Sequence, residues 1–342
     1  MVDGDGSIVG MTLSRALLVA GALLGWVGAA RAEPLPCRED DRLSETAASL
    51  LMSGESISSS GLLLRAREHD FDGVSLHARE SALEENLRSW LNGLGAGGEG
   101  TLVCGEARNE SRRLVLAAVR GGSLTRSGEL LRGGLERGFS EPRLVVESGA
   151  GELKSFAVTA EQLTKGFTLP AELAARRVQL IAESASGPRP VAELSFVAPP
   201  KAAIDLENKG PKTRSVETLL AQLGSFRRGL GLGNLRDNRL LSESAQRHAA
   251  RVCELGRLAH RVEGEDPELR LKREHVSARG VGEVLARAES SDRAWQALLD
   301  SPSHRLALSR RDFTDAGIGQ ASDQKGQVCL VVLLASWPRR TP

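Results

Sequence analysis

Three side chains in the last third of the chain could form one polar site. His260, Glu283 and His304 follow one another in this order, each inside a short polar motif. Two imidazoles and a carboxylate could share a divalent cation such as zinc or calcium, polarise a bound water, or hold the polar headgroup of a ligand. The sequence therefore predicts that these residues form one site, which could hold a metal.

The motif around His304 supplies supporting residues. Pro302 directly after a serine is typical of a helix start, which would hold the imidazole on a fixed backbone. A hydrolase would need Ser301 or Ser303 as its nucleophile, but residues so close on a turn seldom orient toward the neighbouring histidine, and the sequence has no GxSxG elbow. The side chains expected to support the site are Ser301, Ser303 and Arg305.

The elements that position these residues are visible as periodic patterns. An apolar stripe predicts a helix over 216–228, and a longer helix follows with His248 on its small-residue face, where we interpret it as a packed core residue. Residues 316–321 and 327–335 predict a hairpin. Its second strand is apolar on both faces, which places it in the centre of a covered sheet.

Five short motifs follow one another in the last third of the chain: Leu258-Ala259-His260, Gly282-Glu283, Trp295, Ser301-Pro302-Ser303-His304-Arg305 and Phe313-Thr314-Asp315-Ala316-Gly317-Ile318-Gly319. Their joint order resembles the CAP superfamily, also called SCP-like extracellular domains, over about residues 214 to 338. The resemblance implies a three-layer α-β-α sandwich with a surface cleft in which His260, Glu283 and His304 converge.

The sequence also departs from the pattern of the family. Val284 and Ala307 stand where asparagines are usual, and Leu298 stands where some relatives carry a second acidic residue. A complete set of two histidines and two carboxylates is therefore not matched, although Asp300 or Glu289 could substitute in space.

Three functions are compatible with such a site. The first, which we favour, is a non-catalytic binding module for a lipid, glycan or peptide of the cell envelope or the extracellular medium. The alternative is a metal-assisted or histidine-based hydrolase acting on peptide or cell-wall substrates. In the third, the histidines and the carboxylate only hold the fold together through buried hydrogen bonds.

The N-terminus resembles an export signal. Arg15 precedes an apolar run over 16–27, and small residues at Ala30 and Ala32 suit a signal peptidase, so cleavage after Ala32 is expected. Translation starting at Met11 would give the signal a more typical beginning. An uncleaved anchor is the alternative, but the run is shorter than the ~20 residues that a spanning helix needs. We expect a secreted or periplasmic protein without a transmembrane anchor after cleavage.

Export would place the four cysteines in an oxidising compartment, where an even number suggests two disulfides. Four cysteines allow three pairings. If domains fold as units, Cys37 pairs with Cys104 and Cys253 with Cys329; buried free thiols are the alternative.

The rest of the chain predicts an α+β protein of several domains. Residues 33–94 have helical periodicity, 95–198 read as short strands of a β-sandwich, and 199–213 form a linker before the domain at 214–338. No internal repeat is evident. His69 and His77 are isolated and predict no site.

Charge argues against nucleic acid as a partner. The chain has 45 basic and 44 acidic residues, a formal charge of +1, and no tyrosine. It therefore lacks both the long-range field and the stacking platforms that nucleic-acid binding uses.

Overall fold

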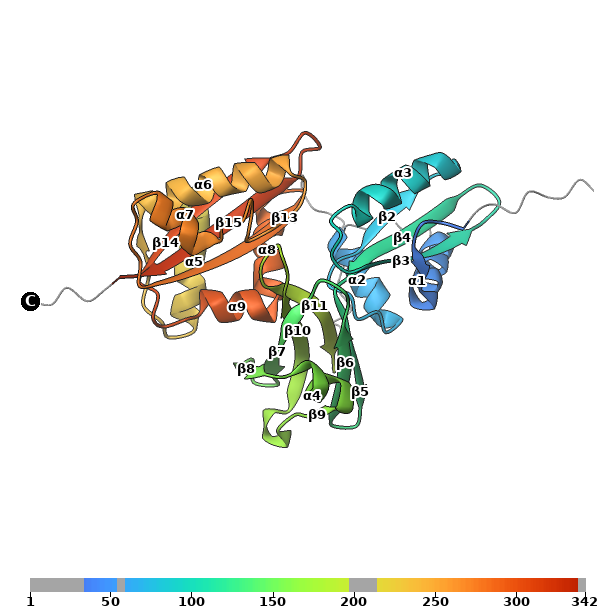
Figure 1. The fold of residues 1–342 in the computed structure, drawn as a ribbon, viewed down its shortest axis with the longest axis horizontal. Coiled ribbons are helices and arrows are strands. Elements are labelled where there is room, and N and C mark those ends of the chain that lie inside the picture. The colour runs from blue at the N-terminus through green and yellow to red at the C-terminus, as the bar shows by residue number, and fades with distance from the viewer. Residues whose placement is uncertain (1–33, 54–58, 197–213, 338–342) are drawn as a thin grey trace, which may run out of the picture. The chain divides into compact units, whose positions relative to one another are not determined.

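The computed structural model describes residues 34–53, 59–196 and 214–337. These residues form an α+β protein that we divide into an N-terminal module (35–120), a central module (121–196) and a C-terminal module (214–337) (Figure 1). The predicted signal segment 1–32 and the predicted linker 199–213 lie outside the described residues. Within them, no helix has the length and apolar character needed to cross a membrane.

The N-terminal module is a four-stranded sheet with helices packed against it. Its strands run in the order β1-β3-β4-β2. The predicted boundary between residues 94 and 95 is wrong, because β3 and β4 pair with β1 and β2 and so belong to the same sheet. Its elements are β1 (Arg38–Glu39), α1 (Asp41–Ser53), α2 (Ser59–Glu68), β2 (His77–Glu80), α3 (Glu84–Gly95), β3 (Thr101–Arg108) and β4 (Arg113–Arg120).

The central module holds two small sheets that share one apolar core. The orders are β11-β10-β7-β8 and β5-β6-β9, and Leu124 and Leu131 of the second sheet pack with Leu144 and Val178 of the first. The predicted β-sandwich region thus begins near residue 122 rather than 95. Its elements are β5 (Gly122–Ser127), β6 (Leu130–Leu135), β7 (Ser140–Ser148), β8 (Leu153–Ala157), α4 (Ala160–Lys165), β9 (Phe167–Thr168), η1 (Ala171–Leu173), β10 (Ala175–Glu183) and β11 (Arg189–Ser195).

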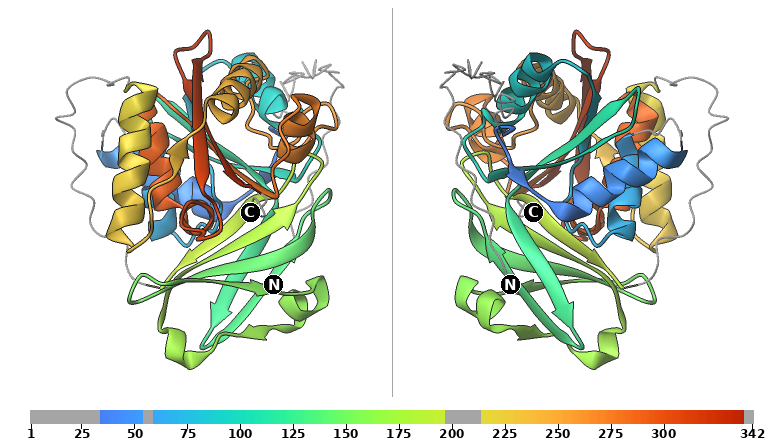
Figure 2. Two further views of the ribbon diagram at one scale, coloured as in Figure 1. Left: turned by 90° about the vertical axis from the view of Figure 1, so that its left-hand side faces the viewer. Right: turned by 90° about the vertical axis from the view of Figure 1, so that its right-hand side faces the viewer.

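The C-terminal module is a second four-stranded sheet, in the order β12-β14-β15-β13. Helices cover both of its faces, with α5 and α6 on opposite sides (Figure 2). Its elements are α5 (Val216–Gly229), β12 (Arg236–Asp237), α6 (Arg239–Glu254), α7 (Pro267–Arg273), β13 (Gly280–Ala288), α8 (Ser291–Asp300), α9 (Pro302–Leu308), β14 (Asp315–Ser322) and β15 (Val328–Ser336).

Alternation along β13 and β15 explains the two covered faces. Successive strand residues point to opposite sides of a sheet, so Val284 packs against α5 and α8 while Leu285 packs against α6 and α7. Every residue of β15 is buried. This confirms the prediction that the strand is central and covered.

Helix α6 lies directly on the backbone of β14. Asn238 caps the helix by accepting hydrogen bonds from the amides of Leu240 and Leu241. A Cβ atom on Gly317 would lie 2.2 Å from the amide nitrogen of Ser242, so only glycine permits this contact.

Cysteine pairing follows the prediction. Cys37 bonds Cys104 in the N-terminal module, and Cys253 of α6 bonds Cys329 of β15. The second bond fixes the longer helix to the central strand.

The N-terminal and C-terminal modules repeat one topology, although no internal repeat is evident in the sequence. In both, a two-residue strand pairs in parallel with the third strand of the sheet in chain order, which pairs in antiparallel with the fourth, and the fourth with the second. In both, a glycine of the third strand, Gly105 or Gly317, touches the backbone of the helix that follows the two-residue strand, at Leu43 of α1 or Leu241 of α6. The copies share identical residues in the segment that runs from the two-residue strand into the helix, where Arg38, Leu43, Ser44, Glu45 and Ala47 match Arg236, Leu241, Ser242, Glu243 and Ala245.

Candidate functional site

The centre of the candidate site is the carboxylate of Glu283, whose side chain is 1% exposed. His260 Nδ1 donates to its Oε1 at 2.9 Å, and the guanidinium of Arg270 bonds its Oε2. His248 Nε2 lies 3.7 Å from Oε1. The structure therefore gathers two imidazoles and one guanidinium around a single buried carboxylate.

The surroundings of Glu283 keep it ionised. Burial acts to raise the pKa of this carboxyl, but the hydrogen bond from His260 and the charges of His260, Arg270 and His248 outweigh it, so the pKa lies below its usual value. A carboxylate whose pKa is lowered in this way is a poor general base, because its donors stabilise the ionised form over the protonated one.

Each member of the cluster is placed by its own element. Glu283 alternates with Val284 on edge strand β13 and so points to the face covered by α6 and α7. Asp266 caps α7 by accepting from the amide of Leu269, which sets the start of the short helix that carries Arg270.

His248 is buried, as predicted, but it is more than a packing residue. Its Nε2–H donates to the carbonyl of Ala259 at 2.9 Å while the ring faces Glu283. Burial lowers the pKa of His248, and the charge of Glu283 opposes this only in part. Arg270 was not foreseen, since an arginine in a short charged helix carries no signal that separates it from its exposed neighbours.

His304 is not bonded to Glu283. Helix α9 packs on the opposite face of the sheet, where Leu308 shares a core with Val284. The Nδ1 atom of His304 is buried and has no hydrogen-bond partner in the described part of the chain. Burial, with a smaller effect of the charge on His260, lowers the pKa of His304 to about 3.

The three residues predicted to support the cleft contact the central module instead. The amide of Ser303 and the hydroxyl of Ser301 both donate to Gln179 Oε1, at 3.1 and 3.3 Å. Arg305 pairs with Glu147 of β7 at 2.8 Å. The predicted SPSHR motif thus anchors α9 to the sheet of β7 and β10.

The positions that depart from the family pattern add no second acid to the cluster. Val284 and Leu298 are core residues on the face away from Glu283, and Ala307 packs beside them. Asp300 is exposed, and Glu289 pairs with Arg293 at 3.7 Å. Neither carboxylate substitutes near Glu283.

These residues do not fit a metal centre. Among the described residues, no three His, Cys, Asp or Glu side chains are grouped so that they could hold a metal ion. Both oxygens of Glu283 are engaged by His260 and Arg270, and a cation there would face a guanidinium. The cluster is therefore unsuited to zinc or calcium.

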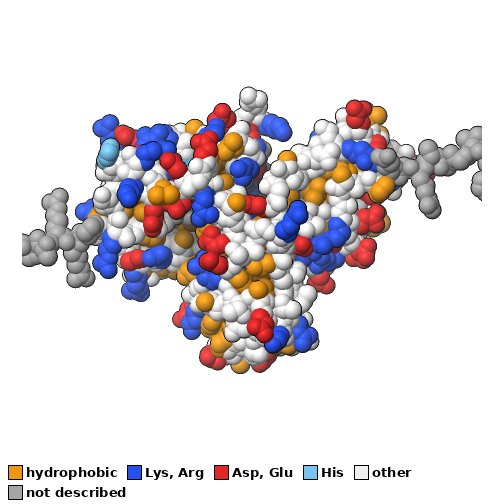
Figure 3. Space-filling model, in the orientation of Figure 1, with side chains coloured by type: hydrophobic (Ala, Val, Ile, Leu, Met, Phe, Trp, Pro, Cys, Tyr) orange, Lys and Arg blue, Asp and Glu red, His pale blue; other side chains and the backbone are white. Residues whose placement is uncertain are grey.

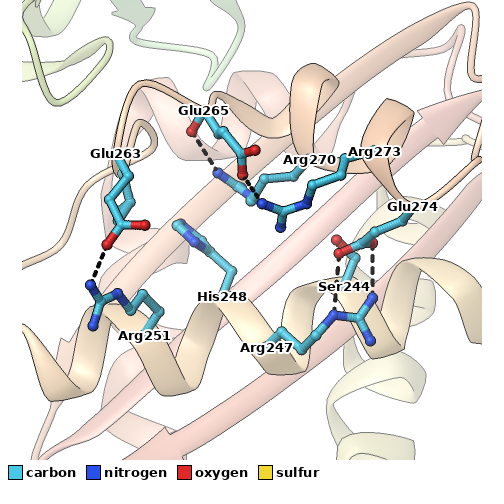
Figure 4. A pocket seen from close by; sticks show the side chains of 10 residues that line it. Ser244, Arg247, His248, Arg251, Glu263, Glu265, Arg270, Arg273 and Glu274 are labelled. Carbon is cyan, nitrogen blue, oxygen red and sulfur yellow. Dashed lines mark hydrogen bonds and ion pairs between the residues drawn. The ribbon is translucent and has the colours of Figure 1, made fainter.

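A cavity of about 210 Å³ lies against the cluster. His248 rises from α6 in its centre, with charged pairs around it (Figure 4). Arg251 pairs with Glu263 and Arg273 with Glu265. The other lining residues are Ser244, Arg247, Val262, Arg270 and Glu274.

The repeated fold shows what stands in place of the cluster in the other copy. In the C-terminal sheet, Leu333 pairs with Gly317 on one side and with Glu283 on the other. In the N-terminal sheet, Leu116 pairs with Gly105 on one side and with Ala78 on the other, so Ala78 occupies the position of Glu283. His248 lies seven residues after Leu241, and Leu50 lies seven residues after Leu43. The N-terminal copy thus builds the same sheet with a leucine and an alanine at these two places.

Comparison with known proteins gives structural neighbours only. The sequence matches no protein-family model, and no curated protein is significantly similar to it. Among solved structures, an outer surface protein of Borrelia burgdorferi is 23% identical, with a TM-score of 0.35, covering 38% of this chain and 100% of its own. An extracellular SCP-domain protein of Bacillus anthracis is 13% identical, with a TM-score of 0.33, covering 63% and 67%. Venom allergen-like protein 4 of Schistosoma mansoni is 13% identical, with a TM-score of 0.28, covering 36% and 87%.

Proposed function

We propose that this chain is an exported protein whose C-terminal module is a CAP-like three-layer domain that binds a small polar ligand of the cell envelope or extracellular medium, without turning it over. Export is supported by the signal-like segment 1–32 and by the two disulfides, which suit an oxidising compartment. Binding is supported by the cluster around Glu283 and the cavity beside it.

The contrast between the two copies carries this proposal. Burying Glu283 with Arg270 and two imidazoles costs desolvation energy that an apolar core does not. The N-terminal module reaches the same topology with Leu50 and Ala78, so the topology does not require the charged cluster. This argues against a purely structural role and favours recognition.

The lining of the cavity indicates the class of ligand. Arginine and glutamate side chains of both signs surround His248 (Figure 4). Paired charges of this kind suit a ligand that carries its own donors and acceptors, such as a peptide end or a glycan, and they reject an acyl chain.

The state of the titratable groups favours binding over hydrolysis. Both oxygens of Glu283 accept hydrogen bonds that favour its ionised form. The hydroxyl of Ser301 donates to Gln179, and the hydroxyl of Ser303 lies 3.1 Å from that of Ser301, so both serines contact the central module or each other rather than Glu283. The hydrolase alternative therefore lacks a nucleophile at the cluster, and Glu283 is poorly suited to act as its base.

Saturation-transfer NMR on the purified exported chain tests the proposal with three probes: a zwitterionic tripeptide, chitotetraose and dihexanoylphosphatidylcholine. We expect transfer to the peptide or the glycan but not to the lipid. Arg247→Gln, which changes a residue of α6 that lines the cavity, should weaken the transfer to the peptide or the glycan. The matched control is Arg239→Gln, which removes a similar exposed pair, with Glu243, from the same helix outside the cavity and should leave it unchanged.

Three results would contradict the proposal. The first is the absence of transfer to both the peptide and the glycan. Transfer to the lipid alone would exclude a polar ligand. Cleavage of the tripeptide or of chitotetraose, lost in His260→Ala, would favour the hydrolase instead.

A further inference from the structure

In the turn between β10 and β11, Ala185 is exposed, but the residues on either side of it are buried, which is unusual for the end of a hairpin. Tips of connecting segments normally face solvent, but Ser184 and Ser186 are 8% and 5% exposed. The turn is closed by Gly187, whose amide donates to the carbonyl of Ser184 at 3.0 Å and whose φ is +97°. Something other than the central module must therefore cover it.

One side of the turn contacts the segment that carries His260. The amide of Arg261 donates to the carbonyl of Ser186 at 3.0 Å, and its guanidinium donates to the carbonyl of Ser184 at 3.2 Å. Arg257 donates to the hydroxyl of Ser186 at 3.0 Å. A Cβ atom on Gly187 would lie 2.8 Å from the Cβ of His260. The turn is thus seated on the histidine of the candidate site.

The other side of the turn is held by the N-terminal module. Glu99, in the connection between α3 and β3, accepts from the amide of Ser186 at 3.0 Å. Its second oxygen accepts from Arg189 at 3.1 Å, at the start of β11. One carboxylate therefore fixes both the tip and the base of the turn.

We propose that the segment Ser184–Gly187 is a built-in cover over His260, held closed by Glu99, so that a ligand reaches the His260–Glu283 pair only when the central module moves away. The cover uses backbone carbonyls and one small residue at its tip, and it leaves the His260 side chain 16% exposed. This inference concerns access to His260 and holds whatever the ligand of the proposed function is.

A second contact strengthens the closed arrangement. Gln179 on β10 accepts from Ser301 and Ser303 on α9, and Glu147 on β7 pairs with Arg305. Because β10 leads into the turn, the anchor on α9 and the cover on His260 belong to one rigid hairpin. Opening the cover therefore requires the contacts with α9 and the contacts with the segment of His260 to break together.

Chemical modification of histidine by diethyl pyrocarbonate tests the cover without any ligand. In the full exported chain, mass spectrometry should show His260 reacting more slowly than His275, which is exposed. Gly187→Ala, whose new methyl group meets His260, should raise the rate at His260 by roughly threefold or more, as loss of local protection does.

Gly326→Ala is the matched control, since Gly326 also has a positive φ in a hairpin turn but has no atom within 4 Å of an added Cβ. It should leave the rate at His260 unchanged. Glu99→Ala is the second variant, which loosens the turn without touching the C-terminal module and should also raise the rate. Equal rates at His260 and His275 in the unmodified chain, or a rate at His260 that neither Gly187→Ala nor Glu99→Ala raises, would overturn the proposal. A failure to bind any polar probe would contradict only the proposed function.

Discussion

Glu283 is the residue on which the cluster depends. It alone is in contact with both an imidazole and a guanidinium, and its side chain is almost completely buried. Removing the acid from such a group leaves the remaining charge buried without a partner, which costs more than the pair itself contributes.

Glu283→Ala should therefore lower the free energy of unfolding by about 3 to 5 kcal/mol, measured by urea denaturation, because Arg270 stays buried and unpaired. Glu243→Ala, which removes an exposed acid from the same module, should have little effect. The triple variant Glu283→Ala, His248→Leu, Arg270→Leu should be less destabilised than Glu283→Ala alone, since it approaches the apolar solution of the N-terminal copy. A triple variant with a larger loss would mean that the cluster is needed for packing.

Sequence reasoning identified part of this cluster and not the rest. His260 and Glu283 stood in recognisable motifs. His248 was identified only as a buried residue, because a helical stripe shows burial but not the partner across the space. No sequence pattern indicates Arg270, since its role depends on where α7 begins, at Asp266. The sequence predicts His304 beside Glu283, but strand β13 separates α9 from α6 and α7.

At the scale of elements, α9 and β10 form the joint between the C-terminal and central modules. The joint is polar: Gln179 is buried, its oxygen accepts from two serines, and its amide nitrogen donates to Glu193 at 2.8 Å. A buried amide with its hydrogen bonds satisfied specifies one arrangement, because any shift leaves polar groups unpaired.

Gln179→Ala should therefore loosen α9 without unfolding the sheet. The amide of Ser303 loses its acceptor, so its hydrogen exchange should become faster in peptides covering α9, measured by mass spectrometry. Gln162→Ala is the control, because it removes a capping residue of α4 in the same module and should leave exchange in α9 unchanged. Unchanged exchange in both variants would show that the joint does not depend on Gln179.

The periodicity of apolar residues predicts single helices and strands better than it predicts which strands pair. The apolar stripes of α5 and α6 and the apolar run of β15 are sufficient to predict these elements, because each pattern reflects the burial of its own element. The membership of β3 and β4 could not be read in this way, since pairing with β1 and β2 joins residues that are far apart in sequence. The repeat was missed for a related reason: most matched positions need only be apolar, so few residues stay identical.

The stability of the whole molecule should depend on pH through two buried groups, His304 and Glu283. The imidazole of His304 binds a proton near pH 6.5 when unfolded but only near pH 3 when folded. Between these values the unfolded chain holds more protons, so stability is greatest above pH 6.5 and falls with the pH, by up to about 1.4 kcal/mol per unit. Glu283, whose folded pKa is lowered, adds a further loss below its usual value of 4.5.

Urea denaturation across pH 4 to 7.5 measures this slope. His304→Asn should make it shallower between pH 6.5 and 4.5, because the group responsible is gone. His275→Asn, at an exposed position with a φ of +59° that asparagine tolerates, should keep the slope of the unmodified chain. Identical slopes in all three proteins would mean that His304 is not buried in solution.

Across the face drawn in Figure 3, acidic and basic side chains are interspersed rather than separated into fields. This agrees with the near-balance of 45 basic and 44 acidic residues. Recognition by this molecule is therefore expected to act at short range, through the geometry of a particular site.

The contact of α6 with the glycines of β14 has a consequence for that geometry. At Gly317 and again at Gly319 the helix rests on bare backbone, and Cys253 ties its far end to β15. A helix seated this way has no compressible side-chain layer beneath it and cannot slide or roll. His248 is therefore held in a fixed position at the cavity. Any adaptation to a ligand must come from the opposite side of the cavity, where Arg270 lies on the short helix α7, which has two turns.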